Sequence, residues 1–170
     1  MSNTNRWKSL SAPGIILLSA AMLLSHISVA AAESLTNGQK VLDNSPSAQM
    51  DDQLRLIGTW QLVSGEYLND KQQWVDYRSL HLSAIKVISA SHFSFTTMAH
   101  NTDTPTFWAA GAGRYQANGT DYVEYPELNS FNAPVNAAFT FSYRLEGDNW
   151  YTQRFEDGVL KEKELWRRIK

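Results

Sequence analysis

Short alternating segments separated by turn-forming residue pairs constrain this chain more than any other feature of its sequence. Asn118-Gly119, Gly147-Asp148 and Asp157-Gly158 each separate two segments of strand length, and Ala90-Ser91 does the same. Asn-Gly and Asp-Gly pairs tolerate positive φ at the centre of a tight turn, so they favour β-hairpins. No segment keeps a 3.6-residue apolar period over helix length. The pattern therefore predicts an all-β chain, an antiparallel up-and-down barrel of about eight strands.

The expected strands occupy most of the chain beyond residue 57. They are residues 58–68, 85–89, 92–98, 106–117, 120–125, 137–146, 149–156 and 159–170. Successive side chains of a strand point to opposite faces, so the alternating aromatic residues should share one interior. An eight-stranded barrel is just wide enough to be filled by its own side chains or to hold one small ligand.

The first 32 residues have the pattern of a signal peptide. Arg6 and Lys8 precede a short apolar run at 14–24, and the small residues 30–32 offer a cleavage site before Glu33. The alternative is a membrane anchor, but the apolar run is shorter than the roughly 20 residues that span a bilayer. We expect a signal peptide at 1–32, a polar flexible leader at 33–53 and one domain at 54–170. The product would be periplasmic or secreted, with no stable membrane span after cleavage.

Composition excludes several classes of function. The formal net charge is −2, and loss of residues 1–32 would remove two basic residues and no acids. Nucleic acids and anionic lipids call for basic patches, so neither is an expected partner. The chain has no cysteine, which excludes disulfides, thiolate metal sites, cysteine nucleophiles and the cysteine-linked lipid of a lipoprotein.

Gly58 and Trp60 open the first strand, and Trp166 and Arg168 lie near the end of the last. The first and last strands of a closed barrel are neighbours. Arg168 could therefore stack on the indole of Trp60 and donate to backbone carbonyls, closing one end, while Gly58 leaves room for a neighbouring side chain. The alternative is that Trp60 is ordinary core and that both Arg167 and Arg168 are solvated.

Four short motifs resemble, in their order, those of one family. They are GTW (58–60), IKVISASHFSF (85–95), GAGRY (111–115) and ELWRR (164–168). Over roughly 54–170 the chain resembles the calycin superfamily of lipocalins and fatty-acid-binding proteins, and more closely the small secreted lipocalin-like domains of bacteria. The resemblance implies that the barrel binds a small hydrophobic or amphipathic molecule, although a fold alone does not establish a function.

The candidate ligand-binding residues are those that the alternation turns inward, together with one acidic side chain. They are Phe93, Phe95, Phe107, Tyr115, Tyr122, Glu124, Phe139, Phe141 and Tyr143. The aromatic members could equally fill the barrel, because cores and pockets use the same residue types. Glu124 and Arg114 could both face solvent. If Glu124 is buried it needs a donor, such as a tyrosine or arginine across the barrel. Glu162 and Glu164 share a face with Trp166, so at least one of these acids could also be enclosed.

Two long connections, 69–84 and 126–136, could form the mouth of the barrel. Trp74 and Tyr77 would then be lid residues, as large side chains on mobile loops often are. Both connections could equally be plain surface loops.

Two other functions compete with ligand binding. An isomerase or cyclase could run acid–base chemistry with Glu124 and a tyrosine. However, the sequence shows no metal-ligand motif, nucleophile elbow or nucleotide-binding loop, so no catalytic residue, metal or cofactor is assigned. An envelope interaction module would instead have a filled barrel and an exposed apolar patch.

Overall fold

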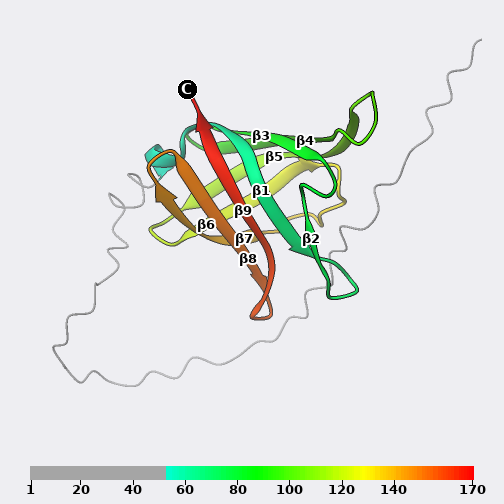
Figure 1. Cartoon of the computed structure of the whole chain (residues 1–170). Helices are drawn as coiled ribbons and strands as arrows, with labels where there is room; N and C mark the ends of the chain where they lie inside the picture. The colour runs from blue at the N-terminus through cyan, green and yellow to red at the C-terminus, as the bar shows by residue number, and fades with distance from the viewer. Residues whose placement is uncertain (1–52) are drawn as a thin grey trace, which may run out of the picture.

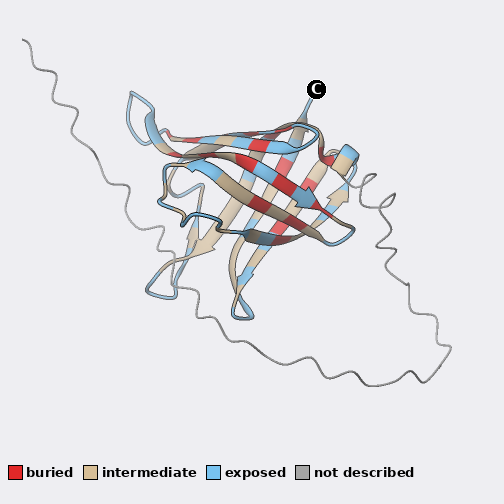
Figure 2. Cartoon of the chain, turned by 180° about the vertical axis from the view of Figure 1, so that it is seen from behind, coloured by how far each residue is buried: buried red, intermediate tan, exposed pale blue. Residues whose placement is uncertain are grey.

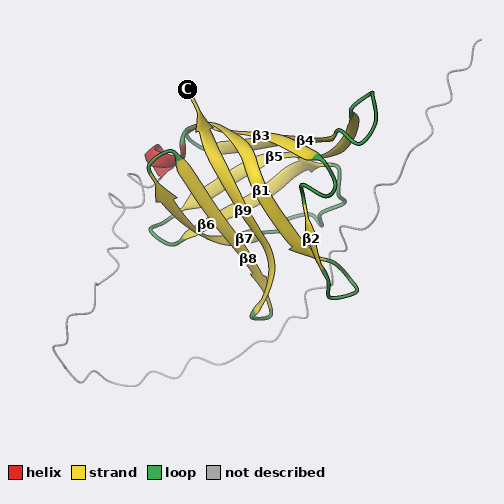
Figure 3. Ribbon diagram, viewed as in Figure 1, coloured by secondary structure: helices red, strands yellow, loops and turns green. Residues whose placement is uncertain are grey.

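The computed structural model describes residues 53–170. The expected signal peptide (1–32) and almost all of the expected leader (33–53) lie outside the described residues. Within residues 53–170, the one helical segment is a single turn at 53–56, and no helix there has the length and apolar character needed to cross a bilayer. Figure 3 shows that the other described residues form strands and the loops that join them.

The predicted closed antiparallel barrel is confirmed, with one additional short strand (Figure 1). The elements in order are β1 (Gly58–Leu68), β2 (Trp74–Asp76), β3 (Leu82–Ile88), β4 (His92–Ala99), β5 (Thr106–Ala117), β6 (Asp121–Asn129), β7 (Phe139–Glu146), β8 (Asn149–Glu156) and β9 (Val159–Ile169). Each strand from β3 to β8 pairs with the strand that follows it, and β1 pairs with both β3 and β9. This last pairing closes the barrel and removes the open edges of the sheet.

Strand β2 lies within the 69–84 connection, in which no strand was predicted. It pairs with the second half of β1, from Glu66↔Asp76 to Leu68↔Trp74, while β3 pairs with the first half. The following residue continues this arrangement, since the amide of Tyr77 donates to the carbonyl of Gly65 at 2.9 Å. The 69–84 connection is therefore held against the barrel beside β1.

The turns follow the local chemistry of the sequence. Asp157 and Gly158 both have positive φ, at 51° and 76°, as the two central residues of a type I′ turn require. The hairpin between β5 and β6 differs from the expected type I′ turn, because neither Asn118 nor Gly119 has positive φ. Instead, the side-chain oxygen of Asn118 accepts the amides of Thr120 and Asp121 at 3.0 and 2.8 Å. This Asx-type turn makes β6 begin one residue later than expected.

Buried residues recur along the strands of the barrel (Figure 2), and their side chains form the core. The largest fully buried side chains are those of Trp60, Trp150, Tyr122, Phe93, Leu56 and Ile88. Trp150 packs edge-on against both Trp60 and Tyr122, with ring centroids 5.2 and 5.0 Å apart. These rings fill the half of the barrel that contains the start of β1 and the end of β9.

Candidate functional site

The filled end of the barrel is sealed by Arg168 and Trp60, which are direct partners in the β1–β9 register. The guanidinium carbon of Arg168 lies 4.1 Å from the centre of the indole ring of Trp60. Its two terminal nitrogens donate to the carbonyls of Ile57 and Arg55, each at 2.6 Å. The indole nitrogen of Trp60 donates to the carbonyl of Leu56 at 2.9 Å. The helical turn at 53–56 is thus fastened across this end of the barrel.

Gly58 is required by this arrangement for two reasons. Its φ of 144° is one that side chains with a Cβ rarely adopt, and a Cβ there would lie 2.4 Å from Nη1 of Arg168. The first and last strands of the barrel therefore approach each other closely at Gly58 and Arg168.

The other half of the barrel holds an internal cavity of about 200 Å³. Every strand except β2 contributes to its lining, together with the connections that follow β1, β2 and β6. Its walls combine an apolar part and a charged part. The apolar part includes Leu62, Phe95, Trp108, Phe131, Phe139, Phe141 and Trp166, and the charged part includes Lys86, Glu124, Arg154, Lys161, Glu162 and Glu164.

Lys86 and Glu124 form a buried ion pair at the inner end of the cavity. Lys86 Nζ lies 2.7 Å from Glu124 Oε1, and the two residues are only 4 % and 5 % exposed. The hydroxyl of Tyr122 donates to the same oxygen at 2.9 Å. Burial alone would lower the pKa of Lys86, but the carboxylates of Glu124 and Glu164 outweigh burial and raise it. Lys86 is therefore charged, as a buried ion pair requires.

Aromatic rings surround this ammonium group. Lys86 Nζ lies 5.0 to 5.8 Å from the ring centres of Phe95, Tyr122, Phe141, Trp150 and Trp166. The negative faces of such rings attract a cation, which offsets part of the cost of removing it from water.

A second polar cluster lies on β9 and its neighbours. Both oxygens of Glu162 are occupied: Tyr77 donates to Oε1 at 2.5 Å, and Arg154 Nε donates to Oε2 at 3.0 Å. Arg154 also pairs with Glu156. Burial, then the charges of Glu162 and Glu164, raise the pKa of Tyr77 well above its usual value. The hydroxyl therefore stays protonated and serves as a donor.

Glu164 differs from its neighbours because no lysine or arginine among residues 53–170 forms an ion pair with it. Its Oε2 accepts the indole N–H of Trp166 at 2.9 Å and, more weakly, the hydroxyl of Thr152 at 3.4 Å. Burial, and secondly the charge of Glu162, raise the pKa of Glu164 to about 7. This carboxyl therefore exchanges a proton near neutral pH inside the cavity.

The predicted ligand-binding residues divide into four groups, the last of which is Phe107 alone. Phe95, Glu124, Phe139 and Phe141 line the cavity. Phe93, Tyr115 and Tyr122 are buried in the filled part of the core and do not line it. The hydroxyl of Tyr115 donates to the carbonyl of Ser89 at 2.9 Å, and burial raises the pKa of this tyrosine to about 12. Tyr143 is half-buried against the core and borders a different hollow.

The expectation that Phe107 points inward is wrong, because its side chain is 57 % exposed. A β-bulge causes the difference: Thr97 pairs with Ala109 but Met98 pairs with Phe107, so Trp108 is an extra residue. The bulge reverses the inward–outward phase at the start of β5. Trp108 lines the cavity where Phe107 was expected.

Sequence reasoning missed Lys86, Arg154, Trp108 and Phe131 as cavity residues. In β3 the apolar residues Ile85 and Val87 face outward, 49 % and 45 % exposed, while Lys86 faces inward. Alternation of apolar and polar residues predicts the opposite orientation, so it gives no signal for Lys86. Arg154 lies on the same face of β8 as the buried Trp150. Its even spacing from this tryptophan could therefore have predicted that Arg154 points inward.

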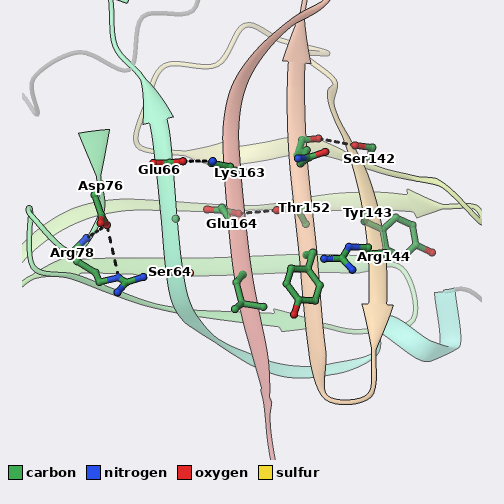
Figure 4. Close-up of a pocket in the computed structure, with 14 residues that line it drawn as sticks. Ser64, Glu66, Asp76, Arg78, Ser142, Tyr143, Arg144, Thr152, Lys163 and Glu164 are labelled. Carbon is green, nitrogen blue, oxygen red and sulfur yellow. Dashed lines mark hydrogen bonds and ion pairs between the residues drawn. The ribbon is translucent and has the colours of Figure 1, made fainter. Parts of the chain in front are cut away.

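A larger hollow of about 490 Å³ lies over the outside of β1, β9, β8 and β7 (Figure 4). Its side chains are mainly polar, and several already pair with each other: Lys163 with Glu66, and Arg78 with Asp76 at 4.0 Å. Arg144 pairs with Glu146, which lies outside the hollow, and stacks on Tyr151 at 3.9 Å. This hollow is the more open of the two. Its buried polar residue, Thr152, hydrogen-bonds to Glu164, and Glu164 also lines the internal cavity. We therefore take the internal cavity as the candidate site.

Among residues 53–170, no three histidine or acidic side chains gather closely enough to hold a metal ion. Comparisons of the chain with protein-family models, with curated proteins and with solved structures found no match.

Proposed function

We propose that the protein is an exported, lipocalin-like binding protein that holds a small amphipathic molecule inside its barrel. The observation that carries this proposal is the internal cavity of about 200 Å³, which has an apolar wall of aromatic rings and a charged wall. Binding sites for small molecules commonly combine a mainly apolar lining with a few polar groups that fix orientation. The opposite end of the barrel is sealed by Arg168 and Trp60, so a ligand would enter past the β1–β2 and β6–β7 connections.

Native mass spectrometry of the protein purified from its own host tests this proposal. Ala109 lines the cavity, whereas Ala110 is its neighbour on the opposite face of β5. We expect a co-purifying small molecule on the wild type and on Ala110→Leu, and none on Ala109→Leu, which fills the cavity. A wild type without added mass, or an Ala109→Leu variant that keeps it, would count against the proposal.

Export can be tested on the same sample. Cleavage after Ala32 predicts a protein that begins at Glu33 and is recovered from the periplasm or the medium. A purified chain that still contains residues 1–32 would contradict export by signal peptidase.

An acid–base enzyme is the second candidate, because two observations favour it. Glu124 Oε1 accepts a hydrogen bond from Tyr122 at 2.9 Å, and Glu164 has a pKa of about 7 within the same barrel. A group with a pKa near the working pH is the most effective proton-transfer catalyst. Once the co-purifying molecule is known, incubation with excess protein decides between the two candidates, since an enzyme converts it and a binding protein returns it unchanged. The filled-barrel alternative predicts no cavity, and the observed volume argues against it.

A further inference from the structure

We propose, on the basis of the proposed binding function, that the cavity selects a small organic amine whose ammonium group pairs with Glu164, and that it disfavours carboxylates such as fatty acids. The inference rests on how the charges of the cavity wall are already paired, on the surroundings of Glu164 and on the volume of the cavity.

The two deeply placed cations of the cavity already have carboxylate partners. Lys86 is bound to Glu124 at 2.7 Å, and Arg154 is bound to Glu162 at 3.0 Å and to Glu156. Farther out, Asp70 and Lys161 contribute one charge of each sign to the lining. Glu164 is thus a third inner carboxyl with no basic partner in contact. A ligand carboxylate would therefore have to compete with Glu124, Glu156 and Glu162 for the two inner cations.

The groups that face Glu164 come from four sides. Glu162 lies two residues away on the same face of β9, Thr152 is its partner on β8, and Trp166 donates to it from β9. Lys86 from β3 and Glu124 from β6 act on it through space, and so do the hydroxyls of Tyr77 and Tyr122. Arg154 is hydrogen-bonded to the neighbouring Glu162. The donors from Trp166 and Thr152 stabilise a carboxylate, and a cation in the cavity would supply the missing positive charge.

The apolar wall and the volume define the rest of the ligand. Phe131 bridges Phe95 and Phe139, with ring centroids 6.2 and 6.1 Å apart, and all three line the cavity. A cavity of about 150 Å³ holds one benzene molecule, so 200 Å³ suits an apolar body and head group of about ten non-hydrogen atoms. A long-chain fatty acid exceeds this volume.

Three probes of matched shape test the charge preference by isothermal titration calorimetry at pH 7: 3-phenylpropylamine, 3-phenylpropan-1-ol and 3-phenylpropanoate. We expect the amine to bind about tenfold or more tightly than the alcohol, as a charge-assisted hydrogen bond provides, and the carboxylate to bind most weakly. Titrations extend to about 10 mM, because ligands of this size bind weakly.

Glu164→Gln supplies the decisive variant, since glutamine can still accept the indole N–H of Trp166 while removing the charge. We expect the advantage of the amine over the alcohol to fall below about threefold. Glu146→Gln, on the exposed pair with Arg144, is the matched control and should keep the wild-type preference. In the wild type the amine should also release up to about half a proton at pH 7, measured in two buffers of different ionisation enthalpy, and none in Glu164→Gln.

The outcomes separate this inference from the function on which it rests. Tighter or equal binding of the carboxylate, or an amine preference unchanged in Glu164→Gln, overturns the amine assignment and leaves a binding function standing. If no probe binds but a co-purifying molecule is lost with Ala109→Leu, the amine assignment again falls and the binding function survives. If no probe binds and no molecule co-purifies, both fall.

Discussion

Lys86 Nζ lies 2.7 Å from Glu124 Oε1 across the interior of the barrel, although their strands, β3 and β6, are not neighbours in the sheet. The pair connects two opposite walls at the inner end of the cavity. Because it is fully enclosed, its two members depend on one another far more than the members of a surface pair do.

Removing one member of this pair should destabilise the protein strongly. Lys86→Met leaves the carboxylate of Glu124 buried without its cation, and we expect a loss of about 3–5 kcal/mol in the free energy of unfolding. The double variant Lys86→Met/Glu124→Met replaces both charges with apolar groups and should recover part of this loss. It should remain about 1–3 kcal/mol below the wild type, because the buried hydroxyl of Tyr122 loses its acceptor. Urea denaturation of the three proteins measures both changes.

Lys170→Met is the control for this series, because Lys170 pairs with Asp148 at the exposed surface. It should change stability by less than about 0.5 kcal/mol. A single Lys86 variant as stable as this control would show that the buried pair contributes nothing.

The seal at the filled end predicts a sharp difference between two adjacent arginines. Arg168→Ala removes two hydrogen bonds to carbonyls and the stacking on Trp60, and should cost roughly 2–4 kcal/mol of unfolding free energy. Arg167→Ala, on the opposite face of β9 and exposed, should cost less than about 0.5 kcal/mol. Equal losses in guanidinium denaturation would refute the assignment of the seal to Arg168.

Gly58 and Arg168 should be energetically coupled. Gly58→Ala places a Cβ 2.4 Å from Nη1 of Arg168 at a φ of 144°, so it is destabilising in the wild type. In an Arg168→Ala background the clash disappears and only the backbone strain remains, so the cost should be smaller by at least about 0.5 kcal/mol. A double-mutant cycle built from thermal or chemical denaturation gives this coupling energy directly, and a value of zero would mean that the close approach is relieved without cost.

The pH dependence of stability should report Glu164. Its pKa in the folded protein, about 7, lies above the ordinary value of 4.5, so between these values the folded chain binds more protons than the unfolded chain. Stability from this group therefore falls as pH rises through that interval, by up to about 3 kcal/mol. The stability of Glu164→Gln relative to the wild type should thus increase from pH 4.5 to pH 8. A difference that is independent of pH would rule out the raised pKa.

The bulge in β5 predicts opposite responses from two aromatic residues that the sequence places in the same class. Phe107→Ala should leave stability within about 0.5 kcal/mol of the wild type because the side chain is mostly exposed. Phe93→Ala, which empties a site that is 2 % exposed, should cost about 3–5 kcal/mol. Comparable losses from the two substitutions would place Phe107 in the core after all.

Turn chemistry and strand alternation were sufficient to predict the closed barrel. The pairing of Arg168 with Trp60 was predicted from the adjacency of the first and last strands, together with the terminal motif of the family that the chain resembles. Both features depend on patterns within single strands and turns, which can be recognised in the sequence without knowing how the strands pair. Phe107 could not be predicted, because an extra residue reverses the phase of a strand and leaves no mark in a single sequence. Lys86 was hidden for a different reason, since Ile85 and Val87 on the same strand point outward and reverse the usual meaning of alternation.

The composition of the cavity wall could be anticipated only in part. Glu124, Glu162 and Glu164 stood out as acids on strands with inward aromatic residues, but their partners come from β3, β8 and the segment after β2. Which of these side chains meet depends on the stagger of the strands around the closed sheet. Bulges in β1, β5, β6 and β9 shift this stagger, so the pairing of charges follows from the assembled barrel.

The pairing of β1 with β9 joins residues that are more than a hundred positions apart, such as Trp60 and Arg168. Because β9 also carries Glu162 and Glu164, a growing polypeptide has neither a sealed floor nor a complete charged wall until its final eleven-residue strand is docked. Joining contacts of such sequence separation is entropically slow. The cavity and its charged wall therefore become complete in one late step, when β9 pairs with β1 and β8.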